Sequence, residues 1–250
     1  MRLTPLPSTR RTYWHDSRAP RYSLTFALPL LVLYEVMAAA LGGATGGVRN
    51  GADVMLKSVF IRLFGSQGPL VFGALLIGVV SYLVVRDLRG GRRVDAGTFL
   101  AMFVESVLLA VAFGFVVGII SAQLLSPFQT MATGLAQAMS GPTRVMVSLG
   151  AGLYEELLFR VILVGALLWA GKKVFGWGPV ASGIFATLMG ALIFSAFHYV
   201  GPYGDPFAAG SFTFRAVAGV AFSALYIVRG FGITAWTHAL YDLILLGIRG

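Results

Sequence analysis

The sequence contains no cysteine and few charged residues. Without cysteine, the chain can neither form disulfides nor bind a metal through thiolates. Charged residues make up 12% of the chain, whereas soluble domains carry about 25%. Acidic residues are especially scarce, with 10 Asp and Glu against 19 Lys and Arg. These shortages exclude an ordinary water-soluble domain and a cysteine-based zinc site.

Apolar residues are abundant instead, accounting for 57% of the 250 residues. A bilayer can absorb this apolar surface, and a helix that crosses its hydrocarbon needs roughly 20 residues. We therefore expect an all-α fold, a polytopic transmembrane helix bundle with about seven spans, within a range of about six to eight. The expected spans are residues 22–41, 69–86, 98–125, 143–170, 178–200, 212–228 and 231–249.

The remaining segments flank or connect these spans. Residues 50–64 alternate charged with apolar side chains, and residues 127–140 are weakly apolar, so we expect one or two interfacial amphipathic helices. Residues 1–21 form a basic leader, and residues 22–250 form a single transmembrane domain. The run at 22–41 resembles a signal peptide, but Glu35 within it and the many later spans favour an uncleaved first span.

Basic residues cluster between the apolar runs and not along one stripe, so we expect them to position loops at the lipid bilayer and not to bind nucleic acid. A cytoplasmic N-terminus places twelve basic residues inside and six outside. The inside set is Arg2, Arg10, Arg11, Arg18, Arg21, Arg86, Arg89, Arg92, Arg93, Lys172, Lys173 and Arg229. The excess of arginine over lysine indicates a GC-rich genome, so we expect a multi-pass protein of a bacterial inner membrane.

Several ionisable residues nevertheless fall within the apolar runs. Such a residue costs at least about 2.5–3.5 kcal/mol on insertion scales, so it needs a partner or a function. These residues are Glu35, Glu105, Glu155, Glu156, Arg160, His198, His238 and Asp242.

The first motif is Glu155-Glu156-x-x-x-Arg160. Glu156 and Arg160 are four residues apart, so they share a helix face and can pair. Glu155 lies about 100° around the helix from Glu156, which leaves it free to act as a general base. The alternative is an ion-pair network that braces the bundle.

Two further motifs contain the only histidines within the apolar runs. One is Phe194-x-x-x-His198, and the other is His238-x-x-x-Asp242, in which the imidazole and carboxylate share a helix face. Taken singly, the histidines can equally be packed residues or polar helix contacts. Together with Glu155 they supply a carboxylate and two imidazoles, which can activate water and stabilise an oxyanion, as amide hydrolysis requires.

In this order the three motifs resemble those of the CAAX protease and bacteriocin-processing family, also called the ABI family, of intramembrane endopeptidases. The resemblance covers about residues 150–245, within an expected catalytic core at 143–250. It implies that Glu155 and His198 activate water and that His238 and Asp242 stabilise the oxyanion, with Glu156 and Arg160 in support. Many members carry Asn where this chain has Asp242, which adds negative charge.

The resemblance leaves the use of a metal open. Zinc bound by Glu155, His198 and His238 is one reading, although the sequence lacks His-Glu-x-x-His. Water activation without a metal is the reading we prefer, and the absence of Gly-x-Ser-Gly argues against a rhomboid-type serine mechanism. The expected partner is a membrane-associated protein or peptide substrate. The alternatives are a non-enzymatic scaffold or immunity-type protein and a proton-coupled transporter, although the inverted repeats typical of transporters are not found.

Overall fold

The computed structural model describes residues 9–42, 47–89, 94–125, 139–201 and 204–249. Within these residues the chain is helical and contains no strand, as expected. The N-terminal helices are α1 (Thr9–Asp16), α2 (Pro20–Leu41), α3 (Gly51–Phe64), α4 (Gly68–Leu88) and α5 (Ala96–Leu125). The C-terminal helices are α7 (Gly141–Gly150), η2 (Ala151–Val164), α8 (Gly165–Lys173), α9 (Pro179–Phe197), α10 (Ala209–Arg229) and α11 (Phe231–Arg249).

Five helical stretches of the described chain are long and apolar enough to cross a membrane, and the protein is a multi-pass membrane protein. They are Pro20–Leu41, Gly51–Leu88, Ala96–Val117, Pro179–Phe197 and Ala209–Arg229. Each of them contains or overlaps one of the seven expected spans. The other two expected spans, 143–170 and 231–249, are also helical, and they carry most of the polar motif residues.

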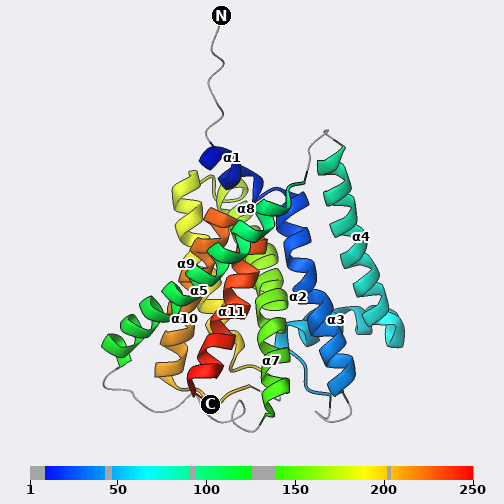
Figure 1. The fold of residues 1–250 in the computed structure, drawn as a ribbon. Coiled ribbons are helices and arrows are strands. Elements are labelled where there is room, and N and C mark those ends of the chain that lie inside the picture. Colours follow the sequence, from blue (N-terminus) through cyan, green and yellow to red (C-terminus); the bar gives the residue numbers. More distant parts are fainter. Residues whose placement is uncertain (1–8, 43–46, 90–93, 126–138, 202–203, 250) are drawn as a thin grey trace, which may run out of the picture.

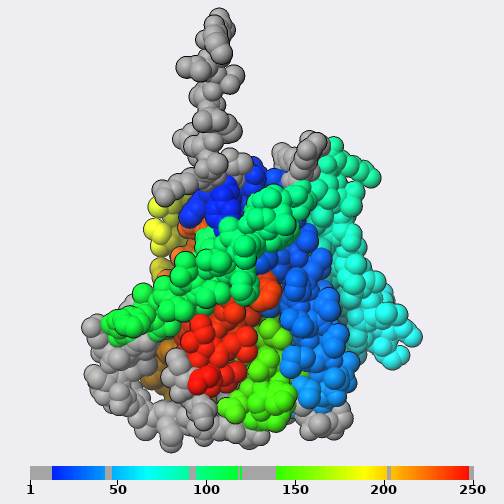
Figure 2. Space-filling view, in the orientation of Figure 1, coloured from blue at the N-terminus to red at the C-terminus, as the bar shows by residue number. Residues whose placement is uncertain are grey.

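These two polar helices lie inside the bundle. The helix α11 packs against α2, α5, α7, η2 and α10, so neighbouring helices surround it. Figure 2 shows α5 running obliquely over α11 and α2 on one face of the molecule. Protein neighbours therefore replace lipid around the motif residues, which makes their polarity tolerable.

Glycine allows the two polar helices to approach closely. A Cβ atom at Gly152 of η2 would lie 2.4 Å from the backbone oxygen of Ala235 and 2.7 Å from Cβ of Ala239, both in α11. No larger residue fits this contact without separating the helices. The small residue thus sets the distance between the first and third motifs.

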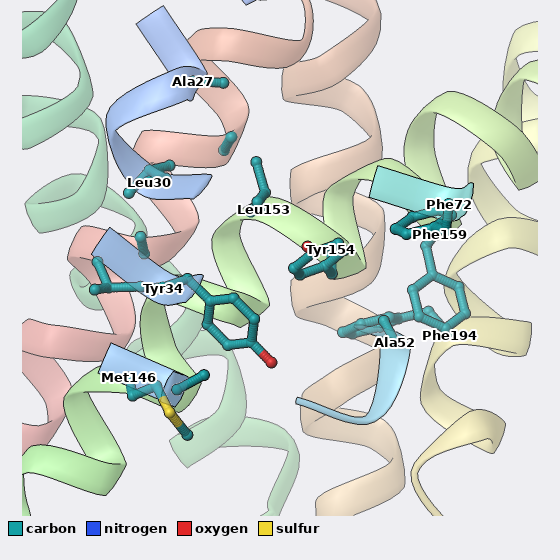
Figure 3. Packing of buried hydrophobic residues seen from close by; sticks show 14 residues of the cluster. Ala27, Leu30, Tyr34, Ala52, Phe72, Met146, Leu153, Tyr154, Phe159 and Phe194 are labelled. Atoms are coloured by element: carbon teal, nitrogen blue, oxygen red, sulfur yellow. The ribbon is translucent and has the colours of Figure 1, made fainter. Parts of the chain in front are cut away.

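The main hydrophobic core lies where η2 meets α2, α3 and α9. Figure 3 shows Tyr34 of α2, Ala52 of α3, Tyr154 of η2 and Phe194 of α9 in this cluster. Tyr34 and Tyr154 pack edge to face, with ring centroids 5.2 Å apart. The site described below borders this core.

The segments outside the expected spans differ from their predictions in two respects. The basic leader contains a helix, α1, and α2 already begins at Pro20, where proline suits the first helical position. Residues 51–64 form a helix, α3, but two residues of its first turn, Ala52 and Asp53, are fully inaccessible. The interfacial helix expected at 127–140 lies almost entirely outside the described residues.

The described parts of the basic segments assigned to one membrane side lie at one end of the molecule. In Figure 1 the N-terminal helix, the end of α4, the start of α5, and α8 occupy the same end of the bundle. Arg21 at the start of α2 pairs with Asp87 at the end of α4 at 3.0 Å, and Arg18 bonds the carbonyl of Ile227 near the end of α10. This geometry agrees with the predicted distribution of charge, while the membrane side itself stays a prediction.

Candidate active site

The first motif lies on a widened helical turn. Residues Ala151–Val164 form a π-helix, and the amide of Gly165, just after it, bonds back to the carbonyl of Arg160, five residues earlier. Such segments are rare and occur frequently at functional sites. Glu155, Glu156 and Arg160 all belong to this segment.

Glu156 is fully buried and has two partners. Its Oε2 lies 3.2 Å from Nε of Arg160, the pair predicted from their spacing, and both side chains are at most 1% exposed. Its Oε1 lies 2.7 Å from Nδ1 of His238 on α11. Glu156 therefore joins the first motif to the third, a contact that spacing along one helix cannot indicate.

Arg160 connects the first motif to the second. Its guanidinium carbon lies 4.5 Å from the ring centroid of Phe194 on α9 and 5.7 Å from that of Phe222 on α10. Its Nη1 and Nη2 are buried, and no hydrogen-bond partner for them occurs among the described residues. The buried guanidinium depends on Glu156 for its counter-charge and on aromatic faces for further stabilisation.

His238 lies between two carboxylates. Its Nδ1 bonds Glu156, and its Nε2 lies 3.8 Å from Oδ2 of Asp242, one turn along α11. The second distance is too long for a hydrogen bond. Phe222 stacks on the imidazole at 4.4 Å between ring centroids, which fixes the plane of the ring. Nε2 of His238 is thus not hydrogen-bonded to Asp242.

His198 follows the last residue of α9 and has a defined tautomer. Its Nδ1 lies 2.9 Å from the carbonyl oxygen of Phe194. A carbonyl only accepts, so Nδ1 carries the proton and a neutral ring leaves the Nε2 lone pair available. The carbonyl of His198 accepts from the amide of Asp205 at 2.9 Å. Asp205 also pairs with Arg215 of α10, which ties the loop after His198 to that helix.

Glu155 accepts a hydrogen bond that the motif analysis did not foresee. Nδ2 of Asn50, directly before α3, lies 2.9 Å from Oε1 of Glu155. Electrostatic interactions also link the Glu155 carboxylate to His198 and His238. The Glu155 carboxylate, which was predicted to stay free, thus accepts a hydrogen bond from Asn50. No local pattern around Asn50 points to Glu155, and the one available hint was its position as a polar residue before an expected helix.

The structure therefore brings all six predicted residues into one region and separates them by exposure. Glu156, Arg160 and His238 are buried, whereas Glu155, His198 and Asp242 keep partial exposure. Glu155, His198 and Asp242 are thus the more accessible of the six side chains. Whether these residues carry the predicted roles stays a prediction.

A zinc site is not preformed by these side chains. Among the described residues, no group of three or more His, Cys, Asp or Glu side chains is arranged to hold a metal ion. Nδ1 of His238 bonds Glu156 and Nδ1 of His198 bonds a carbonyl. These bonds leave Nε2 of both imidazoles unused, as in metal sites where a carbonyl or carboxylate holds the other ring nitrogen. Zinc binding by Glu155, His198 and His238 stays a prediction, and we derive no step through a metal.

The other two acidic residues within the spans have basic partners outside the motifs. Glu105 of α5 holds Arg229 of α10 through two contacts, at 2.6 and 2.7 Å. Glu35 of α2 pairs with Arg49 at 2.6 Å and with Lys57 at 2.8 Å. Burial alone would lower the pKa of Arg49, but its hydrogen bonds hold the pKa above its ordinary value. Both glutamates join helices together.

Comparison with known proteins agrees with the motifs. Residues 137–244 match the family described as Type II CAAX prenyl endopeptidase Rce1-like. No curated protein and no solved structure matched the chain. The match spans all three motifs and confirms the resemblance drawn from them. Residues 137–244, which hold Glu155, His198 and His238, are therefore similar to Rce1-like endopeptidases of the CAAX protease and bacteriocin-processing family.

Proposed function

We propose that the protein is an intramembrane endopeptidase that hydrolyses a peptide bond near the C-terminus or membrane segment of a membrane-associated protein or peptide. The observation that carries this proposal is the convergence of Glu155, His198 and His238 from η2, α9 and α11 within the matched domain. The description of the family adds a candidate substrate class, prenylated chains that end in Cys-aliphatic-aliphatic-X.

Glu155 and His198 activate the water in this mechanism. Both are partly exposed, and Nε2 of His198 has its lone pair free because Nδ1 is held by a carbonyl. One of the two groups takes a proton from water as the water oxygen attacks the scissile carbonyl carbon. The same proton then moves to the departing nitrogen as the carbon–nitrogen bond breaks, which yields a carboxylic acid and a free amine.

His238 stabilises the oxyanion. The carboxylates of Glu156 and Asp242 flank its ring, a setting that favours positive charge on the imidazole. Its Nδ1–H is donated to Glu156, which leaves Nε2–H to face the oxyanion. Asp242 supports this charge through His238, because a carboxylate in direct contact would repel the oxyanion.

The experiment uses the full chain in lipid nanodiscs and a quenched fluorescent peptide that ends in a farnesylated Cys-aliphatic-aliphatic-X sequence. We expect cleavage by the wild type and its loss in Glu155→Gln and His198→Ala, with melting temperatures close to wild type. An identical peptide without the farnesyl group tests the lipid requirement, and a chelator tests the metal-free route. Cleavage that survives both substitutions would refute the proposed chemistry, and a chain that never cleaves either peptide would favour the scaffold.

A further inference from the structure

The carboxylate proposed as the base is held by a residue outside the matched domain. Asn50 precedes Glu155 by 105 positions and lies well before residues 137–244. It is the only asparagine in the sequence and is 3% exposed. Its Nδ2 donates to Oε1 of Glu155 at 2.9 Å. The N-terminal helices therefore contribute directly to the site.

The orientation of the Asn50 amide is defined by its other contacts. Its Oδ1 accepts from the backbone N–H of Ala52 at 2.9 Å, which caps α3. Its own backbone N–H is donated to the hydroxyl of Tyr34 on α2 at 3.1 Å. Because the N–H of Ala52 can bond only an acceptor, the oxygen must lie on that side and the donor must face Glu155.

A buried ionic network anchors these contacts. The hydroxyl of Tyr34 is donated to Asp53 at 2.8 Å, and Asp53 is fully buried. Arg49 and Lys57 each pair with Asp53 at 2.6 Å. Tyr34 thus ties the first turn of α3 to α2, and two basic side chains hold Asp53 in place. Asn50 cannot shift without disturbing several charge-assisted bonds.

The same network reaches the residue next to Glu155. The hydroxyl of Tyr154 is donated to Glu35 at 2.7 Å, and Glu35 also binds Arg49 and Lys57. The η2 backbone is therefore held on one side of Glu155 by Tyr154, while Asn50 holds the carboxylate itself. The charges of the network balance, because two acidic residues, Glu35 and Asp53, face two basic residues, Arg49 and Lys57.

We propose that Asn50 is a positioning residue that aims the Glu155 carboxylate, with the ionic network of α2 and α3 holding Asn50 in place. The inference rests on the proposed role of Glu155 as the base. It gives the N-terminal part of the chain a function in catalysis beyond anchoring the bundle. Misplacement of a reacting group by 1 Å can cost about a hundredfold in rate.

Asn50→Asp separates positioning from capping. Aspartate keeps the shape and the capping oxygen, but it presents an acceptor to Glu155 where asparagine presents a donor. With the farnesylated peptide in nanodiscs, we expect kcat to fall about a hundredfold with KM unchanged. Asn50→Ser, which also keeps a capping oxygen but does not reach Glu155, should lower kcat in the same way.

Asp95 offers a matched control at the start of α5. Its carboxylate accepts from the amide of Thr98 at 2.9 Å, and its backbone N–H is donated to the hydroxyl of Tyr22 on α2 at 2.8 Å. It thus repeats the cap and the tyrosine contact of Asn50 without touching a motif residue. Asp95→Ala should leave kcat at the wild-type value.

A swap of donor and acceptor tests the contact without any substrate. Asn50→Asp alone opposes two carboxylates and should lower the melting temperature by about 2–4 °C. Glu155→Gln alone should change it little, because the glutamine oxygen can still accept. In the double variant the glutamine amide can donate to Asp at position 50, so the melting temperature should recover. This recovery is the non-additivity expected for residues in contact.

The outcomes separate the inference from the proposed function. Wild-type kcat in Asn50→Asp, or a double variant that melts no higher than Asn50→Asp, would overturn the positioning role. If Glu155→Gln cleaves the peptide as well as wild type, the proposed function fails, and the melting temperatures still decide whether Asn50 holds position 155. If Glu155→Gln is inactive while Asn50→Asp is fully active, only the inference about Asn50 fails.

Discussion

Replacing Glu156 by glutamine removes the one carboxylate that pairs with the buried guanidinium of Arg160 among the described residues. Both side chains are at most 1% exposed, and the same carboxylate also holds His238 at 2.7 Å. Removing one partner of a buried ion pair costs about 3–5 kcal/mol, because the other charge stays buried without compensation. For a protein of this size each kcal/mol shifts the melting temperature by about 2–4 °C. We therefore expect Glu156→Gln to melt about 6–20 °C below wild type.

The adjacent glutamate supplies the comparison. Glu155 is partly exposed and accepts one side-chain hydrogen bond, from Asn50, which glutamine can also accept. Glu155→Gln should therefore stay within about 2 °C of wild type, in line with one conserved hydrogen bond. Glu156→Gln is thus expected to lower stability, whereas Glu155→Gln is expected to lower activity, although the two glutamates are neighbours.

Thermal unfolding of the purified variants in nanodiscs, followed by intrinsic tryptophan fluorescence, measures this difference. The double variant Glu156→Gln, Arg160→Met removes both charges and should recover much of the loss, because the uncompensated guanidinium is gone. A Glu156→Gln protein that melts with wild type, or a double variant less stable than Glu156→Gln, would refute the assignment of Glu156 as the counter-charge of Arg160.

Two further predictions concern helix packing. Glu105→Gln should destabilise the protein by about 3 kcal/mol, because Arg229 is 2% exposed and loses a two-point partner; chemical denaturation measures the loss, and an unchanged midpoint would contradict it. Gly152→Ala should cost about 1–3 kcal/mol, because its Cβ would lie 2.4 Å from the oxygen of Ala235. The same change should lower peptide cleavage by moving η2 away from α11, whereas Gly73→Ala, where a Cβ meets nothing within 4 Å, should do neither.

The local pairs of the site were predictable because they depend only on helix periodicity. Glu156 and Arg160 pair, and His238 and Asp242 lie near each other, each four residues apart as a shared helix face requires. The contact of Glu156 with His238 spans 82 positions. It was not predictable, because spacing within a helix carries no information about which neighbouring helix that face meets.

The number of spans shows a similar limit. Five stretches of the described residues are apolar enough to be recognised by hydropathy, whereas 143–170 and 231–249 carry the first and third polar motifs. The sequence identified these two as helices of the bundle. Their central position, with α11 enclosed by five helical elements, follows from packing.

The sequence by itself determined that this chain is a helical membrane protein and which few ionisable residues in its spans needed a purpose, because burying charge in lipid is costly wherever it occurs. Only the tertiary structure decided that Asn50 holds Glu155 and that Glu156 joins Arg160 to His238. Those contacts depend on the register between helices, which close approaches such as Gly152 against Ala235 fix in three dimensions.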